Sequence, residues 1–199
     1  MCKGAWLSEA VTQSKSALRA RLKGVAAGVS AADVLRWSSQ VIDRLESVPE
    51  IAGARTMLAF LPIPGEVDLS EMLERRLRAG DRVALPAIDW ATRAMWPGLV
   101  SGLDDVDATR HGVRAARGDA PIVPVEDIDL VLVPGLGFDR NGGRLGRGAG
   151  FYDRFLATAG LRALKIAVGF EWQIVDALPR EGHDVLMDVV VTEAGVWRR

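Results

Sequence analysis

The sequence predicts an α/β protein, a single three-layer domain in which helices flank a mainly parallel central sheet. Short apolar runs typical of strands alternate with segments of helical periodicity along the chain. One apolar run, residues 128–135, ends in Pro-Gly and is typical of a strand buried on both faces. The 199 residues suffice for one sizeable core and are few for two. We therefore expect one domain over residues 1–199, with residues 1–13 as a loosely ordered N-terminal tail.

Helical periodicity predicts four helices, over residues 14–30, 31–48, 68–81 and 151–160. In the first, Leu18 and Leu22 lie four residues apart and begin an apolar stripe. In the second, Ser30 stands where an N-cap is needed, and Pro49 lies shortly beyond the end. In the third, Gly80 has the position of a C-terminal cap.

Strands are predicted at residues 56–60, 82–88, 128–135, 165–170 and 188–192, with a further short strand near 94–100. Ligands of such sheets lie beyond the carboxyl ends of parallel strands. The loops that start at Leu61, Pro134 and Phe170 each follow a predicted strand, so we expect the functional site among them.

Composition narrows the classes of function. Basic and acidic residues number 25 and 26, which argues against a nucleic-acid binder that works by bulk electrostatics. Cys2 is the only cysteine, so no intrachain disulfide can form, and with two histidines a standard structural zinc site is not expected. The N-terminus is too short and polar for a secretory signal, and no apolar stretch reaches the length of a membrane span. We expect a cytoplasmic protein without membrane or nucleic-acid partners.

The segment GGRLGRGAGFYDRFL, residues 142–156, is the most informative stretch of the chain. Neither a Walker A motif nor G-x-G-x-x-G occurs in it. Glycines at alternate positions, 146, 148 and 150, allow the backbone to bend closely around a ligand with its N–H groups exposed. Arg144 and Arg147 add planar donors suited to phosphate oxygens.

A helix that begins near Phe151 directs its positive end toward the same place, and Asp153 lies in its first turn. An aspartate beside phosphates is typical of a Mg²⁺ site. The alternative interpretation is a glycine-rich surface turn with solvated arginines, in which Asp153 only stabilises the helix dipole.

The longer segment VPGLGFDRNGGRLGRGAGFYDRFL, residues 133–156, resembles the signature of the 5-formyltetrahydrofolate cyclo-ligase family. Other elements of that family follow in order: Lys15-x-x-Leu18-Arg19, Glu66 in LPIPGEVDL, and the closing segment 170–193. The resemblance extends from about residue 15 to residue 193.

The resemblance implies ATP-dependent ring closure of 5-formyltetrahydrofolate to 5,10-methenyltetrahydrofolate, with release of ADP and phosphate. ATP phosphorylates the formyl oxygen, N10 attacks the resulting iminium carbon, and phosphate leaves. Such a reaction requires positioning and charge neutralisation more than a protein nucleophile. It also implies ATP as co-substrate, Mg²⁺ as cofactor, and a folate partner with or without a polyglutamate tail. We expect the protein to be a monomer or a weak homodimer.

Roles for individual residues follow from the same resemblance. The ATP-binding residues would be Lys15, Ser16, Arg19, Arg144, Leu145, Gly146, Arg147, Gly148, Ala149, Gly150, Phe151 and Tyr152. The folate would contact Ile63, Glu66 and Tyr152. Arg147 would stabilise charge during phosphoryl transfer, and Asp153 and Asp188 would hold Mg²⁺.

Each role has an alternative. Lys15 and Arg19, four residues apart, can form a solvated helix face. Glu66 can cap the following helix, in which case Asp68 takes the pterin role. Asp188 can be an ordinary strand-end residue. Of the tryptophans, Trp172 is the one expected nearest to the site.

Three features depart from the family pattern. Ala26 stands where members often have an arginine, Ala149 stands where some have a lysine, and residues 110–121 lack a common Glu-Pro pair. These departures motivate a second hypothesis, a non-catalytic paralogue that binds folate or a nucleotide.

Overall fold

The computed structural model describes residues 14–199, so the tail expected for residues 1–13 lies outside the described residues. The α-helices are α1 (Lys15–Ala27), α2 (Ala31–Glu46), α3 (Pro49–Gly53), α4 (Ser70–Arg78) and α5 (Phe151–Leu156). Short 3-10 helices span Arg110–Gly112, Val125–Asp127 and Glu171–Gln173. The first half of the chain contains strands β1 (Thr56–Leu58), β2 (Arg82–Asp89), β3 (Ala94–Leu99), β4 (Val106–Ala108) and β5 (Arg114–Ala116). The second half contains β6 (Leu130–Val133), β7 (Gly137–Asp139), β8 (Arg144–Leu145), β9 (Leu164–Val168), β10 (Ile174–Val175), β11 (Val189–Val191) and β12 (Val196–Arg198).

A seven-stranded sheet in the order β12-β11-β9-β6-β1-β2-β3 forms the centre of the protein. The five inner strands are parallel to one another, whereas β3 and β12 pair antiparallel at the two edges. This arrangement confirms the prediction of a mainly parallel sheet. The carboxyl ends of the inner strands consequently lie at one edge, where the functional site was expected.

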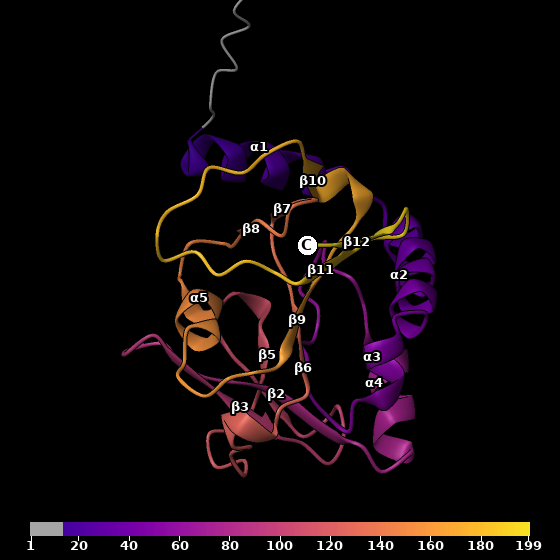
Figure 1. Cartoon of the computed structure of the whole chain (residues 1–199), viewed down its shortest axis with the longest axis vertical. Helices are drawn as coiled ribbons and strands as arrows, with labels where there is room; N and C mark the ends of the chain where they lie inside the picture. The colour runs from indigo at the N-terminus through magenta and orange to yellow at the C-terminus, as the bar shows by residue number, and fades with distance from the viewer. Residues whose placement is uncertain (1–13) are drawn as a thin grey trace, which may run out of the picture.

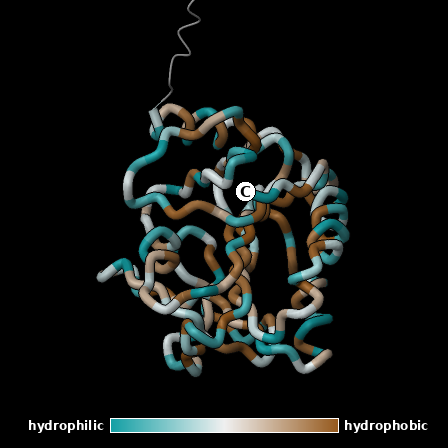
Figure 2. The backbone as a smooth tube through the Cα atoms, in the orientation of Figure 1, coloured by the Kyte–Doolittle hydropathy of each residue, from teal (hydrophilic) through white to brown (hydrophobic). Residues whose placement is uncertain are grey.

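Both faces of the sheet are covered. Along β6, Leu130 and Leu132 pack in the core that contains residues of α2, α3 and α4, while Val131 and Val133 pack in the core that contains residues of α5. Figure 1 shows these helices on opposite sides of the strands, and Figure 2 shows the central strands as mainly hydrophobic. Side chains of a strand alternate between faces, so a strand in the middle layer is apolar throughout, as predicted for 128–135.

Several boundaries differ from the predictions. The second helix ends at Glu46, and Pro49, which lies shortly beyond that end as predicted, begins an additional helix, α3. Proline suits the first turn of a helix because its missing N–H would have no partner there. The helix predicted over 151–160 ends at Leu156. None of the helices within residues 14–199 has both the length and the apolar character needed to cross a membrane.

A small second sheet, β10-β7-β8, carries the glycine-rich segment. Its β7–β8 hairpin is organised by Asp139, a carboxylate that is 1% exposed. Asp139 accepts hydrogen bonds from the backbone N–H groups of Asn141, Gly143 and Leu178 at 2.9, 2.9 and 3.1 Å. Arg180 pairs with the same carboxylate at 3.1 Å. A Cβ at Gly143 would lie 2.2 Å from Asp139, so only glycine fits beside it.

We predict that Asp139→Ala lowers the free energy of unfolding by about 3 kcal/mol, because it leaves several buried N–H groups without acceptors. Denaturant unfolding followed by circular dichroism measures this change. Asp119→Ala, at an exposed position, serves as the control and should change stability by less than about 0.5 kcal/mol. Equal stabilities of the two variants would contradict the role assigned to Asp139.

Candidate functional site

Two cavities meet at the glycine-rich segment. The larger has a volume of about 440 Å³ and lies beyond the carboxyl ends of β1, β2 and β6. Its lining includes Phe60, Leu61, Ile63, Glu66, Ile88, Trp90, Pro134, Gly135, Arg147 and Tyr152. The smaller, of about 310 Å³, is lined by Lys15, Arg19, Leu145, Gly148, Glu181, His183 and Asp184. Arg144, Gly146, Gly150 and Asp153 line both cavities.

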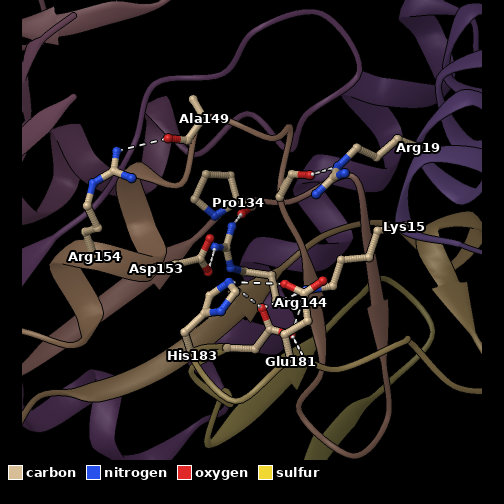
Figure 3. Close-up of polar contacts among 11 residues, drawn as sticks. Lys15, Arg19, Pro134, Arg144, Ala149, Asp153, Arg154, Glu181 and His183 are labelled. Carbon is tan, nitrogen blue, oxygen red and sulfur yellow. Dashed lines mark hydrogen bonds and ion pairs between the residues drawn. The ribbon is translucent and has the colours of Figure 1, made fainter. Parts of the chain in front are cut away.

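The side chain of Arg144 lies between the two cavities and is 4% exposed. Its guanidinium donates to Asp153 Oδ1 at 2.5 Å and to the carbonyl of Pro134 at 3.2 Å. It also lies over the ring of Tyr152, 5.6 Å from the centroid. Arg144 therefore connects the end of β6 to the first turn of α5, and Figure 3 shows it pointing toward Asp153 and Pro134.

Backbone conformation and close contacts explain why the segment contains so many glycines. Gly148 and Gly150 have φ angles of 111° and 70°, a backbone conformation that other residues rarely adopt. Gly150 is the N-cap of α5. Because glycine has no side chain, the cap residue accepts no hydrogen bond from the first N–H groups of the helix. A Cβ at Gly146 would lie 3.1 Å from the Arg144 guanidinium. The segment thus combines a tightly curved backbone with a buried cation.

The smaller cavity is lined by charged groups from three parts of the chain. Arg19 of α1 donates to the carbonyl of Gly146 at 2.9 Å. Lys15, one turn earlier, donates to both carboxylate oxygens of Asp184 at 2.9 and 2.8 Å and lies 3.3 Å from Glu181 (Figure 3). Burial disfavours both charges of the Lys15–Asp184 pair, yet their hydrogen bonds prevail. The pKa of Lys15 is consequently raised and that of Asp184 lowered.

The larger cavity contains a second ion pair, between Glu66 and Arg147. Arg147 donates to Glu66 Oε1 through two nitrogens at 3.0 and 3.1 Å, and the N–H of Ile63 donates to Oε2 at 3.3 Å. Burial raises the pKa of the Glu66 carboxyl above its ordinary range, although Arg147 and Ile63 act in the opposite direction. The Arg147 side chain is 39% exposed and that of Glu66 is 9% exposed, so the arginine has more freedom to move.

Three residues of the larger cavity have buried polar atoms without hydrogen-bond partners within residues 14–199: Trp90 Nε1, Arg144 Nε and the Tyr152 hydroxyl. Burial also raises the pKa of Tyr152, so this hydroxyl stays protonated and can donate. Unsatisfied buried donors are costly, and their grouping around one cavity indicates that a bound ligand supplies the acceptors.

The structure brings most of the predicted site residues together. Lys15, Arg19, Ile63, Glu66, Asp153 and the segment from Arg144 to Tyr152 contribute to one or both cavities. Leu145 is buried against Leu18 and Leu22, so its part is mainly to fix the segment on α1. Ser16 lines neither cavity, and its hydroxyl lies 2.9 Å from that of Ser14. Its predicted ATP contact is therefore not provided by this geometry.

Asp188 requires a correction. It precedes β11, accepts a hydrogen bond from the backbone N–H of Lys165 at 2.9 Å, and pairs with the Lys165 ammonium at 3.0 Å. It lines neither of the cavities that contain Asp153. Because β11 is parallel to β9, a residue that precedes β11 lies at the amino ends of the strands, away from their carboxyl ends. The expected pairing of Asp153 and Asp188 is thus not formed.

Of Glu66 and Asp68, the two residues considered for the pterin contact, Glu66 is the one that lines the larger cavity. Asp68 accepts a hydrogen bond from the N–H of Ser70 at 2.9 Å at the start of α4 and lines neither cavity. Phe170 and Trp172 line neither cavity, and Trp172 packs against the core. The connection that starts at Phe170 reaches the smaller cavity further along the chain, through Glu181, His183 and Asp184. Sequence reasoning missed Trp90, which follows β2. The rule that selected Leu61 and Pro134 applies equally to this strand.

The carboxylates of the smaller cavity fit a divalent cation bound together with phosphate. Asp153, Glu181 and Asp184 provide oxygen ligands of the kind that Mg²⁺ prefers. One ligand atom each from Glu181, His183 and Asp184 lie within 4.8 Å of one another. Oδ1 of Asp153 already accepts from Arg144, which leaves Oδ2 for another partner.

Comparison with known proteins accords with this site. A sequence model described as the 5-formyltetrahydrofolate cyclo-ligase family matches residues 11–193. The 5-formyltetrahydrofolate cyclo-ligase of Mycolicibacterium smegmatis is 38% identical over 146 residues, 69% of this chain and 73% of that protein. Its namesake from Escherichia coli is 30% identical over 161 residues, 79% and 88% of the two chains. The NMR structure of Aquifex aeolicus 5,10-methenyltetrahydrofolate synthetase matches with a TM-score of 0.80 and 32% identity and covers 92% of each chain.

The resemblance inferred from residues 133–156 is therefore confirmed over most of the chain. The protein belongs to the 5-formyltetrahydrofolate cyclo-ligase family, a family of ligases.

Proposed function

We propose that the protein catalyses the ATP- and Mg²⁺-dependent cyclisation of 5-formyltetrahydrofolate to 5,10-methenyltetrahydrofolate, with release of ADP and phosphate. The observation that carries the proposal is the position of one segment, Arg144–Asp153, between two cavities of different chemistry. A reaction that passes a phosphoryl group from a nucleotide to a folate requires two adjoining sites of this kind. Membership of the family supports the same reaction.

The smaller cavity suits the triphosphate of ATP. Lys15, Arg19 and Arg144 line it, and the curved backbone at Gly146–Gly150 can approach phosphate oxygens closely. Since Lys15 already pairs with Asp184 and Glu181, these carboxylates hold its ammonium in place for a phosphate contact.

The larger cavity suits the folate, and its volume lies in the range usual for small-molecule sites. Glu66 can accept hydrogen bonds from the amino group and ring N–H of a pterin. Ile63 adds apolar contact, and the Tyr152 hydroxyl and Trp90 N–H supply donors that lack partners among the described residues.

In the first step, the formyl oxygen attacks the γ-phosphorus, the new P–O bond forms, and the bond to the ADP oxygen breaks. N10 then bonds to the activated carbon and loses its proton, and the C–O bond breaks to release phosphate. Arg147 is the group we assign to stabilise charge on the transferring phosphoryl group, because it is the more exposed arginine of the segment and lines the folate cavity.

Asp153 Oδ2 and Glu181 Oε1, which pair with no cation among the described residues, would hold Mg²⁺ in the smaller cavity. Bound there, Mg²⁺ would neutralise phosphate charge during the transfer. We retain a cytoplasmic location, a monomeric or weakly dimeric state, and the absence of nucleic-acid and membrane partners as predictions.

Mixing the purified protein with 5-formyltetrahydrofolate and Mg-ATP, and following the absorbance of the methenyl product, tests the proposal. ATP-dependent product formation is expected. Tight binding of either ligand without turnover would favour the non-catalytic paralogue instead.

Ala149 is one of the departures from the family pattern. Its backbone carbonyl accepts a hydrogen bond from Arg154 at 2.9 Å, so a cation is present beside it.

We predict that Asp153→Asn lowers kcat by about 100-fold or more, because it removes a charged metal ligand and the partner of Arg144. The initial rate of product formation at saturating Mg-ATP measures the effect, and circular dichroism checks the fold. Asp119→Asn, at an exposed site, is the matched control and should keep the wild-type rate. A wild-type rate in Asp153→Asn would remove Asp153 from the metal role.

We predict that Glu66→Gln raises KM for the folate by roughly tenfold or more, because a neutral amide replaces a charged acceptor. Unlike folate binding, the stability of the variant at neutral pH should not fall. Because burial raises the pKa of Glu66, its contribution to stability is fully present at acidic pH and is lost as the pH rises through that pKa.

The variant should therefore have a flatter pH dependence of Tm between acidic and neutral pH, and a Tm at neutral pH no lower than that of the wild type. Thermal unfolding over a pH series provides the comparison. A marked loss of Tm at neutral pH would show that Glu66 is kept for stability and not for ligand binding.

A further inference from the structure

The carboxylate of Glu66 already has most of its acceptor positions filled by protein groups. Its Oε1 accepts two hydrogen bonds from the Arg147 guanidinium, at 3.0 and 3.1 Å, and these occupy both lone pairs of that oxygen. Its Oε2 accepts one bond, from the N–H of Ile63 at 3.3 Å. A pterin that donates from its amino group and its ring N–H needs a position on each oxygen. The pterin and Arg147 therefore compete for Oε1.

The two partners of this ion pair differ in how firmly they are held. Glu66 is buried, and its backbone N–H donates to the carbonyl of Ile63 at 3.0 Å, so a turn fixes it in the cavity wall. The guanidinium of Arg147 is 39% exposed and, within residues 14–199, donates to no group other than Glu66. When a ligand breaks the pair, the arginine therefore moves and the glutamate stays in place.

Arg147 lies at the boundary between the two cavities. Its neighbours along the chain, Gly146 and Gly148, line the smaller cavity, whereas the side chain of Arg147 lines the larger one. An arginine side chain has several rotatable bonds and a planar group of donors that suits phosphate oxygens. A guanidinium released from Glu66 can consequently turn toward a phosphate held at the glycine-rich segment.

We propose that Glu66 holds Arg147 away from the nucleotide until the pterin takes its place, so that folate binding and phosphoryl transfer are coupled. The inference rests on the proposed function, because it takes Glu66 as the pterin acceptor and Arg147 as the arginine that stabilises the transfer. The exchange replaces charge-assisted hydrogen bonds to one carboxylate by others to the same carboxylate, so little net bonding is lost. Glu66 thus acts as a positioning residue for Arg147 in addition to its contact with the folate.

The exchange has a chemical purpose when no folate is bound. An arginine on the γ-phosphate would then stabilise transfer to water, in which the water oxygen bonds to phosphorus, the bond to the ADP oxygen breaks and a proton is released. An arginine held by Glu66 does not assist this unproductive hydrolysis. The same exchange makes the two ligands cooperative, because a nucleotide that attracts Arg147 also frees Oε1 for the pterin.

The experiment uses the full-length protein and two measurements. Calorimetric titration gives the Kd of 5-formyltetrahydrofolate with and without Mg²⁺ and adenylyl imidodiphosphate, an ATP analogue that does not hydrolyse. The release of phosphate from Mg-ATP in the absence of folate gives the rate of unproductive hydrolysis. The variants are Arg147→Gln, Glu66→Gln and the double variant, with Arg78→Gln as the control that removes an exposed ion pair on α4.

In the wild type and in Arg78→Gln, we expect the analogue to lower the folate Kd by about fivefold or more. Arg147→Gln should bind the folate at least as tightly as the wild type without nucleotide, because the competitor for Oε1 is gone, and the analogue should no longer change its Kd. Glu66→Gln should release phosphate without folate about threefold faster or more, because a neutral amide holds the arginine less strongly. The double variant should lose this increase.

Weaker folate binding by Arg147→Gln in the absence of nucleotide would overturn the proposal, because it would show that the arginine contacts the folate and does not compete with it. An unchanged effect of the analogue in this variant would overturn it as well. Absence of methenyl product would contradict the proposed function alone, since the Kd values would still decide whether Arg147 and the folate compete for Glu66.

Discussion

The buried guanidinium of Arg144 is the group on which the arrangement of both cavities depends. It donates both to the carbonyl of Pro134, the residue after β6, and to Asp153 in the first turn of α5. A buried ion pair contributes little net stability by itself, but the loss of one partner leaves an uncompensated charge and costs several kcal/mol. The role of Arg144 is therefore mainly positional, because its bonds hold the first turn of α5, and with it Asp153, next to the end of β6.

A second pair, Arg147–Glu66, differs from the first in its exposure. Arg144 is 4% exposed and Arg147 is 39% exposed, although they are three residues apart in the same segment. The inner arginine therefore holds the segment in place, and the outer one is free to follow a ligand. The hydroxyl of Tyr152, which has no hydrogen-bond partner within residues 14–199, adds a buried donor at the larger cavity.

Much of the fold could be predicted from the sequence because its largest elements have clear periodicity. The apolar run 128–135 contains β6, whose side chains alternate between two cores, and this placed the glycine-rich segment beyond a central strand. The strands β7, β8 and β10 were missed because they are short and lie outside the apolar runs that marked β1 and β11. They depend on long-range contacts such as the bond from the N–H of Leu178 to Asp139.

Site residues were predicted correctly where they follow a parallel strand along the chain. The prediction was wrong for a residue that precedes its strand. Glu66 lies on the connection that leaves the carboxyl end of β1, and Arg147 and Asp153 lie on the one that leaves the carboxyl end of β6, so all three reach the cavities. Asp188 was misplaced because it precedes its strand, so the same rule puts it at the opposite edge. The contact between Lys15 and Asp184 joins residues 169 positions apart, a pairing that no local pattern reveals.

In the reaction that we propose, a phosphoryl group passes directly from a nucleotide in the smaller cavity to the formyl oxygen in the larger one. Substrate labelled with ¹⁸O in the formyl group tests it, with the isotopic content of the released phosphate measured by mass spectrometry. We expect one ¹⁸O atom in the phosphate that is released with each molecule of methenyl product. Unlabelled phosphate, accompanied by normal formation of the product, would contradict it.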